Sequence, residues 1–479
     1  MIEAAPAPAG TRPSSPAPTE PAPTPGRPYR RGRYLALLAL IAVAGGALRV
    51  GYVLVAKRHD PLVGDQIYYS AMGRVLARGD GFRDPFIKDR VVPSADHPPL
   101  TAIVAAPAGW LSDDPATVVL LQRLTMCVVG AAGVFAVGLA ARQAGPRRHR
   151  DAVGLVAAAL AAVYPGFWIN DGLVMAESLG LLSVALAIWA TYRALDEPRT
   201  RRFALLGIAI GLAALTRAEA LLLAPLLVLP AALTRRVPGR ERPTPRQRVG
   251  WIAASAAAVV LVVGPWVGAN MVRFADATTL STNDGLTLLG TNCDPAWKGP
   301  GKGLWVLQCI GAVDSTGDGV DDWTKTERGL DRLGDLPDWS VVSSKYRTAA
   351  LRYLREHLGE LPSVVMVREG RLWGVYKVGG MVFYNTGEGR EDWASWAAAI
   401  AWWVVAVPGL AGLLLLRREE RPAWPLVVQL GAAALVGAVF YGLWRFRIGA
   451  DAAMVISAAA TVVWLGERFS GRRRKPVST

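Results

Sequence analysis

The sequence predicts an all-α polytopic membrane protein with about ten membrane-spanning helices and a small loop domain on the outer face. Three observations predict this fold class. Apolar residues make up 52% of the 479-residue chain. They are concentrated in long runs almost free of charge, and about 20 such residues form a helix that crosses a bilayer. Clusters of Lys and Arg recur in alternate short loops, which is typical of the cytoplasmic loops of membrane proteins.

The net charge of +15 has two interpretations. Basic residues can bind nucleic acid, or they can lie in cytoplasmic loops beside anionic lipid. Here the basic clusters stand in the short loops between apolar runs, so the second interpretation is favoured. We therefore expect membrane lipids as partners and no nucleic acid.

The chain is expected to divide into a tail, a core, a loop domain, further spans and a second tail. Residues 1–30 are rich in Pro, Ala, Thr and Ser, which predicts a disordered cytoplasmic tail. The remaining segments are a transmembrane catalytic core at 31–268, an extracytoplasmic loop domain at 269–392, C-terminal transmembrane helices at 393–467 and a basic cytoplasmic tail at 468–479.

The spans follow from the apolar runs and from alternation of sides. The basic patch at Arg30, Arg31 and Arg33 keeps the N-terminus in the cytoplasm. The expected spans are residues 34–55, 117–141, 152–168, 173–194, 203–215, 219–233, 249–268, 393–416, 423–442 and 450–465. In this order every short loop with three or more basic residues falls on one side, so both termini are expected in the cytoplasm, below the plasma membrane.

The first outer loop, residues 56–116, contains an apolar stretch at 99–111. This stretch is too short to span a bilayer, so we expect interfacial helices here.

Two of the three cysteines, Cys293 and Cys309, fall in the outer loop domain, and Cys127 falls within a span. An even pair in an oxidising compartment predicts a disulfide, with two free thiols as the alternative. The sequence has no CxxC, P-loop or GxGxxG motif, which argues against iron–sulfur and nucleotide chemistry.

Polar residues crowd the outer membrane face, beginning with the stretch GDQIYYSAMGRVLARGDGF at residues 64–82. Asp65, Tyr68, Tyr69, Met72 and Leu76 recur at spacings of three and four, so they share one helical face. Asp is also a favoured helix cap, which is the alternative role for Asp65.

Two further acidic elements follow. Asp96 and His97 precede two prolines that begin the interfacial helix, and a surface pair of no special role is the alternative for them. Asp171 and Glu177 lie at the outer boundary of two spans, where a carboxylate is costly unless it faces a cavity. Turn or cap duty is their alternative role.

Three arginines on the outer side run against the positive-inside trend. Arg217 lies at the tip of the hairpin that joins two spans, close to Glu219. Arg445 and Arg447 follow the penultimate span. Guanidinium groups match phosphate oxygens well, so these arginines are candidates for binding a phosphate. Local ion pairs, with Glu219 and with Asp451, are the alternative.

The order of these elements resembles the glycosyltransferase C-fold superfamily, in the branch of the protein O-mannosyltransferases and the aminoarabinose transferases. The resemblance rests on an early outer-loop acid, a Tyr-rich helix ending in Gly-Phe, His-Pro-Pro-Leu, Asn-Asp followed by Glu-Ser-Leu, Leu-Thr-Arg and a late Arg-Phe-Arg. It covers residues 34–270 best and residues 440–465 weakly. Many members carry two adjacent acids early in the first loop, whereas this sequence has the single Asp65.

The resemblance implies an enzyme that moves a sugar from a polyprenyl-phosphate donor to an acceptor hydroxyl at the extracytoplasmic face. Asp65 is the implied catalytic residue. The expected substrate-binding residues are Tyr68, Tyr69, Asp96, His97, Asp171, Glu177, Arg217, Arg445 and Arg447. The acceptor stays open between protein, glycan and lipid. No cofactor is certain, and a divalent metal stays open although no recognisable ligand spacing supports one.

Two other classes of function are alternatives. A transporter or flippase of a lipid-linked intermediate would also need buried polar residues, but the sequence lacks an internal repeat. A structural scaffold would explain the loop domain but leaves the buried carboxylates unexplained.

Overall fold

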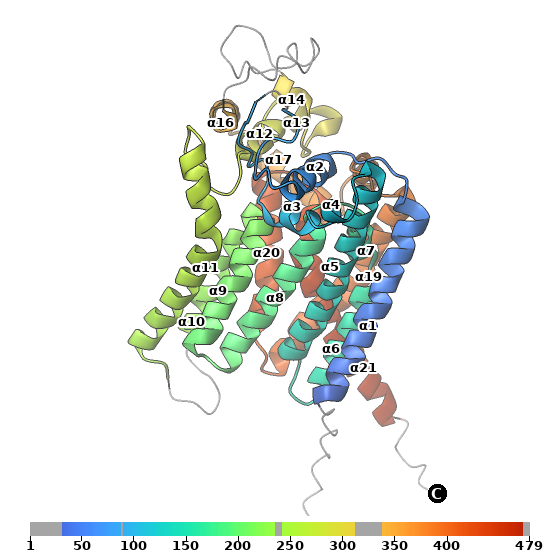
Figure 1. Cartoon of the computed structure of the whole chain (residues 1–479). Coiled ribbons are helices and arrows are strands. Elements are labelled where there is room, and N and C mark those ends of the chain that lie inside the picture. Colours follow the sequence, from blue (N-terminus) through green and yellow to red (C-terminus); the bar gives the residue numbers. More distant parts are fainter. Residues whose placement is uncertain (1–30, 88–89, 235–241, 312–337, 473–479) are drawn as a thin grey trace, which may run out of the picture.

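The computed structural model describes residues 31–87, 90–234, 242–311 and 338–472 (Figure 1). The expected tail at 1–30 and the last seven residues of the expected tail at 468–479 lie outside the described residues. Within the described ranges the chain is helical, and its only β-structure is an isolated bridge between Arg83 and Pro93.

Six helices in the described ranges are long and apolar enough to cross a membrane. Four of them are α5 (Pro115–Ala144), α8 (Glu177–Asp196), α11 (Pro245–Arg273) and α19 (Asp392–Arg418). The first span, Gly32–Lys57, consists of α1 (Arg31–Tyr52) and a π-helical end (Val53–Lys57). The last span, Trp444–Phe469, consists of the 3-10 turn η6 (Trp444–Arg447) and most of α21 (Ile448–Arg472). A seventh results if α6 (Arg150–Val163) and α7 (Pro165–Asp171) are one bent span. The prediction of a multi-pass helical membrane protein is confirmed, whereas the count of ten is not.

The remaining expected spans fall on shorter helices. They are α9 (Thr200–Thr216), the segment Ala218–Leu233 and α20 (Trp424–Val439). The segment Ala218–Leu233 is not the single helix expected at 219–233. It is divided into a 3-10 helix (Ala218–Leu222), a π-helix (Ala224–Val228) and α10 (Leu229–Leu233), and it contains Pro225 and Pro230.

Proline is the physical reason for these breaks. Its ring clashes with the preceding turn and it lacks a backbone donor, which weakens a helix at that point, although α11 and α19 continue through Pro265 and Pro408. The expected span at 152–168 is also broken, because α6 ends at Val163 and Pro165 begins α7 at an angle of 55°.

One end of the bundle is covered by the first loop and the loop domain, and we call this end the loop face (Figure 1). Helix α1 begins and α21 ends at the opposite end. On the loop face, α2 (Asp65–Ala77) buries Tyr68, Tyr69 and Met72, as its periodicity predicts. The apolar stretch expected to be interfacial forms two short helices, α3 (Leu100–Ala105) and α4 (Ala108–Leu111).

The loop domain is built from short helices above the spans (Figure 1). They are α12 (Asp284–Thr291), α13 (Asp294–Trp297), a 3-10 turn (Gly299–Gly301), α14 (Gln308–Gly311), α16 (Trp339–Glu356), α17 (Leu361–Leu372) and α18 (Val378–Gly387).

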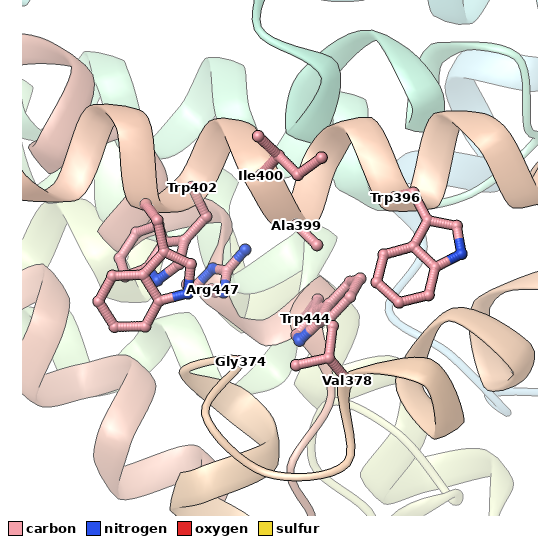
Figure 2. A pocket seen from close by; sticks show the side chains of 9 residues that line it. Gly374, Val378, Trp396, Ala399, Ile400, Trp402, Trp444 and Arg447 are labelled. Carbon is pink, nitrogen blue, oxygen red and sulfur yellow. The ribbon is translucent and has the colours of Figure 1, made fainter.

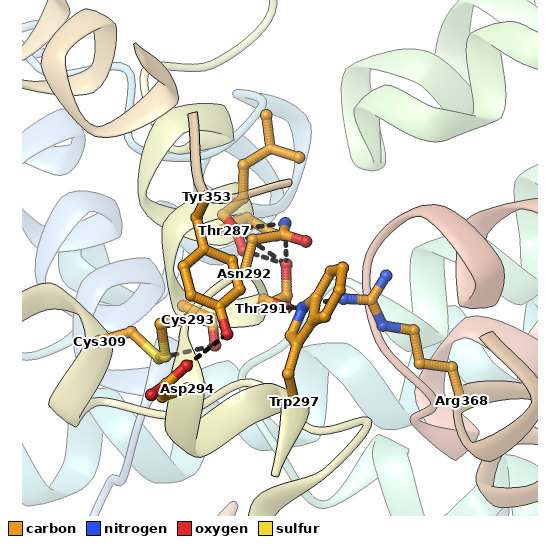
Figure 3. Close-up of a disulfide and its surroundings, with 11 residues drawn as sticks. Thr287, Thr291, Asn292, Cys293, Asp294, Trp297, Cys309, Tyr353 and Arg368 are labelled. Atoms are coloured by element: carbon orange, nitrogen blue, oxygen red, sulfur yellow. Dashed lines mark hydrogen bonds between the residues drawn. A yellow bond between two sulfur atoms is a disulfide. The ribbon is translucent and has the colours of Figure 1, made fainter. Parts of the chain in front are cut away.

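A disulfide joins Cys293 to Cys309 across 16 residues of sequence in this domain (Figure 3). Cys309 packs against the fully buried Trp297, whose indole donates to the carbonyl of Thr291. The same carbonyl accepts from Arg368 of α17, so the disulfide region is tied to the helix that leads back to the membrane.

Helix α21 is the central helix of the bundle. Every residue from Ala450 to Ala460 is buried, and α21 packs against α19, α6 and α8. A helix enclosed in this way holds the preceding turn η6 at a defined place on the loop face, and η6 carries the two late arginines.

Candidate functional site

Arg445 joins three carboxylates that come from distant parts of the chain. Its Nη2 lies 2.6 Å from Oδ2 of Asp65, and its Nη1 lies 2.9 Å from Oε1 of Glu388. Its Nε lies 3.1 Å from Oε1 of Glu177, without the geometry of a hydrogen bond. The guanidinium is only 11% exposed, so these contacts are largely shielded from solvent.

A second guanidinium shares this site. Arg217 ends α9, and its Nη1 lies 3.0 Å from the same Oε1 of Glu177, while its Nε donates to Glu219 at 2.6 Å. Glu177 begins α8 and is completely buried, and among the described residues its Oε2 has no hydrogen-bond partner. Burying a carboxylate oxygen without a hydrogen-bond partner costs free energy, so a hydrogen bond from a ligand to this oxygen would be favourable. We call Asp65, Glu177, Arg217, Glu388 and Arg445 the Arg445 cluster.

The start of α2 shows that Asp65 is not a helix cap. Gly64 is the N-cap residue, with a positive φ of 56°, and within the described structure no side chain caps this helix. Asp65 instead occupies the first helical position, and its side chain is 30% exposed. The carboxylate is therefore directed to Arg445 rather than to the amides of its own helix.

His97 connects Asp65 to the next loop segment. Its Nε2 lies 3.7 Å from Oδ1 of Asp65 and 3.4 Å from Oδ2 of Asp96. The imidazole stacks on the ring of Tyr69, with centroids 4.8 Å apart, and meets the edge of Tyr68 at 5.3 Å. The sequence neighbours on the predicted face of α2 therefore form an aromatic support for His97.

Burial and neighbouring charge set the ionisation of these groups. Burial raises the pKa of Asp65, but Arg445 and His97 outweigh it and hold that pKa well below its usual value. Burial lowers the pKa of His97, but Asp96 and Asp65 more than offset it, and the pKa is raised above 6.5. Burial raises the pKa of Asp96, against the opposing effect of His97. Asp65 thus lies between the guanidinium of Arg445 and the imidazole of His97, and both contacts favour its ionised form.

Sequence reasoning missed Glu388 and its neighbour Arg390. Glu388 caps the C-terminus of α18, and its second oxygen pairs with Arg390, whose Nε donates to Asn170 at 2.9 Å. The only local signal was a charged Gly-Glu-Gly-Arg turn just before an apolar span. Lys57 holds the same turn, because its Nζ donates to the carbonyl of Gly389 at 2.8 Å.

Asp171 does not join the Arg445 cluster. It is 1% exposed, and its two oxygens accept from Nε of Arg49 and from the hydroxyl of Ser178, both at 2.5 Å. The neighbouring helix α5 has Gly130 at this point, where a Cβ would lie 2.2 Å from the Asp171 carboxylate. The geometry favours a structural role in joining α1, α5 and α7.

Arg447 also lies apart from the cluster, and the alternative pairing with Asp451 is what the structure shows. Its Nε donates to Asp451 at 2.9 Å and its Nη1 to the carbonyl of Leu372 at 3.1 Å. Its Cζ lies 4.0 Å from the centre of the Trp402 ring. These contacts of Arg447 are thus with Asp451, Leu372 and Trp402 of α19, and no described contact joins it to the Arg445 cluster.

An apolar cavity of about 150 Å³ borders Arg447 (Figure 2). Tryptophans line it from two elements, with Trp396, Trp402 and Trp403 from α19 and Trp444 from η6. In Figure 2 Arg447 lies beside Trp402 at one end of this cavity. Arg447 thus lines this cavity together with the tryptophans, and its side chain is only 2% exposed.

The described residues offer no set of three or more His, Cys, Asp or Glu side chains arranged to hold a metal ion. The three carboxylates that converge most closely, those of Asp65, Glu177 and Glu388, converge on the guanidinium of Arg445. This donor set does not fit a resident metal.

The fold is similar to that of the oligosaccharyltransferase of the archaeon Archaeoglobus fulgidus. The crystal structure of that protein tethered with an acceptor peptide containing the NVT sequon matches with a TM-score of 0.53 and 14% identity, over 93% of this chain and 51% of that one. The same protein, AglB, in complex with an inhibitory peptide and a dolichol-phosphate matches with a TM-score of 0.51 and 15% identity, over 93% and 53%. This chain therefore spans about half the length of these relatives and has the glycosyltransferase C fold.

Residues 96–267 match the family described as dolichyl-phosphate-mannose-protein mannosyltransferase. This match contains Asp96, His97, Asp171, Glu177 and Arg217. ArnT from Cupriavidus metallidurans bound to undecaprenyl phosphate has a TM-score of 0.38 and 16% identity over 92% of this chain and 79% of that one. No curated protein matches the chain. The resemblance inferred from the order of the motifs is confirmed for the fold.

Proposed function

We propose that this protein is a membrane glycosyltransferase that moves a sugar, a hexose or a pentose, from a polyprenyl-phosphate donor to an acceptor hydroxyl. The observation that carries the proposal is the contact between Asp65 and Arg445, because it places a carboxylate base beside a cation suited to phosphate. The fold, shared with AglB in complex with a dolichol-phosphate, supports the same reading.

In the proposed reaction the acceptor oxygen attacks the anomeric carbon of the donor sugar. The bond between that carbon and the phosphate oxygen breaks, and polyprenyl phosphate leaves with the bonding electrons. Asp65 accepts the proton of the acceptor hydroxyl as general base. Arg445 and Arg217 hold the phosphate and stabilise the charge that it gains.

Donor binding would also activate the base. In the structure Nη2 of Arg445 donates to Asp65, and this contact holds the pKa of the carboxylate low. A bound phosphate would compete for the same guanidinium and weaken its contact with Asp65. The pKa of Asp65 would then rise toward its usual value, so a stronger base would appear only when the donor is in place.

We also propose that the loop face is extracytoplasmic in the plasma membrane and that both termini are cytoplasmic. The arginine clusters at 147–150 and 199–202 follow the ends of α5 and α8 opposite the loop face, as the positive-inside rule requires. The disulfide in the loop domain suits an oxidising compartment.

The distribution of buried charge favours an enzyme over a transporter. Near the loop face the described spans carry the Arg445 cluster and the pairs Arg49–Asp171 and Arg447–Asp451. Other described ion pairs, such as Arg142–Asp151 and Arg421–Asp196, lie at the opposite ends of the same helices. A transporter would be expected to carry its charged binding groups near the midplane.

The proposal is tested by giving radiolabelled polyprenyl-phosphate mannose, glucose and arabinose to membranes that contain the protein. We expect one labelled sugar to appear in a product that is absent from membranes with Asp65→Asn. Transfer of no sugar, or equal labelling in both membranes, would refute the proposed activity.

A further inference from the structure

A cavity of about 270 Å³ lies on the loop face between the hairpin tip that follows Arg217, residues 277–284 and helix α16. Its lining is rich in hydroxyl groups, from Thr278, Thr279, Ser281, Thr282, Ser340 and Ser343. We call it the hydroxyl-lined cavity. It differs in kind from the apolar cavity beside Arg447, which is lined mainly by tryptophan.

Two connections link the hydroxyl-lined cavity to the Arg445 cluster. On one side Ser281 donates to the carbonyl of Asp96 at 2.5 Å, and the carboxylate of Asp96 contacts His97, the neighbour of Asp65. On the other side Ala218 of the lining follows Arg217 directly in the chain. The cavity is thus connected to Asp65 through Asp96 and His97, and to Arg217 through the chain.

A charged pair at the cavity offers both kinds of hydrogen-bonding group. Nη2 of Arg347 lies 2.7 Å from Oδ2 of Asp284, and the two side chains remain 38% and 45% exposed. Sugar hydroxyls both donate and accept, so carboxylate, guanidinium and hydroxyl groups suit them together. The volume is close to the lower limit of about 300 Å³ for ligand pockets, which suits a single sugar unit.

An extended peptide is a poorer occupant. It would need free backbone groups along residues 278–282 to pair with. Those groups are already used, because Thr282 donates its amide to Ala95, and the carbonyls of Leu280 and Thr279 accept from side chains of α11. The hydroxyls of Thr278, Ser281, Ser340 and Ser343 also donate within the protein, so the side chains left for a ligand are chiefly Thr279 and the exposed Asp284–Arg347 pair.

We infer that the hydroxyl-lined cavity binds a sugar unit of a carbohydrate acceptor and directs one of its hydroxyls toward Asp65. The inference rests on the proposed function and names the class of its acceptor. Thr279, Asp284 and Arg347 are then binding residues for the acceptor.

The test measures binding of three probes, the methyl glycosides of mannose, glucose and arabinose, to the purified full chain by saturation-transfer NMR. We expect at least one glycoside to bind, and its affinity to fall at least tenfold in Thr279→Trp, which fills the cavity. Arg347→Met should have a similar effect without adding volume. Arg355→Met, on the exposed side of the same helix, is the matched control and should bind as the wild type does.

A second measurement separates this inference from the proposed function. Radiolabelled undecaprenyl phosphate should bind Thr279→Trp and Arg347→Met within twofold of the wild type, while sugar transfer falls at least tenfold. If the lipid does not bind the wild type, the proposed function fails. If the lipid binds but no glycoside does, or if a Ser/Thr peptide binds in the cavity instead, the carbohydrate acceptor is refuted. Equal glycoside binding in both cavity variants would also refute it.

Discussion

The two oxygens of the Asp65 carboxylate face two different basic side chains. One lies 2.6 Å from Arg445 and the other 3.7 Å from the imidazole of His97. Asp65 can therefore accept a proton from an acceptor hydroxyl, and a bound phosphate would compete with it for Arg445. Its sequence neighbours explain only the helix that carries it, and the chemistry comes from Arg445, 380 residues away.

Replacing Asp65 by Asn should lower the rate of sugar transfer by about 100-fold or more, because the amide cannot accept the proton. The amide oxygen can still accept from Arg445, so expression should stay normal. Asp114→Asn is the matched control, since Asp114 caps α5 by accepting from Thr117 and Asn caps equally well. Transfer by Asp65→Asn at nearly the wild-type rate would remove Asp65 from catalysis.

Substitution of Arg445 or of Arg447 should destabilise the fold, because each removes a cationic partner of a buried carboxylate, but only Arg445 should also affect donor binding. Arg445→Gln should weaken binding of undecaprenyl phosphate by about 10- to 100-fold, the value of a hydrogen bond to a charged group. Arg447→Gln should leave the affinity of the folded protein unchanged. It should destabilise the fold by about 3–5 kcal/mol, because Asp451 loses its buried partner. Filter binding measures the affinity for the lipid, and thermal unfolding measures the stability. Weaker lipid binding by folded Arg447→Gln, with unchanged binding by Arg445→Gln, would contradict the site.

The stability supplied by His97 should depend on pH. Its pKa in the folded protein is raised, so the stabilisation is present below its unfolded pKa of about 6.5 and is lost as the pH rises through the folded value. The difference in melting temperature between the wild type and His97→Gln should be larger at about pH 5.5 than at about pH 8.5. The exposed His59 serves as the control, and a difference independent of pH would contradict the assignment.

At the scale of elements, the close packing of α5 against α7 depends on one glycine. A Cβ at Gly130 would lie 2.2 Å from Oδ2 of Asp171, which holds Arg49 of α1. Gly130→Ala should therefore displace the buried ion pair and cost about 3 kcal/mol or more. Gly268→Ala in α11, where no atom lies within 4 Å of the added Cβ, should be neutral or slightly stabilising. Thermal unfolding of the two variants measures the difference. Equal stability would show that the Arg49–Asp171 pair can move to make room for the added Cβ.

Local pattern predicted the helices better than it predicted the contacts between them. The spacing of Tyr68, Tyr69 and Met72 gave the buried face of α2 because helical periodicity is a local property. The breaks at Pro165, Pro225 and Pro230 were visible as residues, but tertiary packing decides whether a proline ends a span or only bends it.

The candidate site was predicted in part for the same reason. Arg445 was found because an arginine on the loop face is unusual, and that signal is also local. Its contact with Glu388 crosses 57 residues and its contact with Asp65 crosses 380, so no periodicity could indicate them. Arg447 carries the same signal as Arg445, and only the position of Asp451 and α19 distinguishes their surroundings.

At the scale of the whole molecule, the orientation in the membrane can be tested with single cysteines. Arg355→Cys on the loop face should react with a membrane-impermeant maleimide in intact cells. Arg246→Cys, at the start of α11 on the opposite face, should react only after permeabilisation. Background should be low, because Cys127 is buried and Cys293 is bonded to Cys309. The reverse labelling pattern would overturn the proposed sidedness.

The first turn of the last span imposes a constraint on chain length. Arg445 and Arg447 are two positions apart in η6, yet they serve two separate ion-pair networks. In a 3-10 turn each residue advances the side chain by about 120°. One residue inserted between them would leave Arg447 with Asp451 but swing Arg445 out of reach of Asp65. Single substitutions in this turn can therefore affect one ion-pair network at a time. An insertion or deletion in the turn would break either the contacts of Arg445 or those of Arg447.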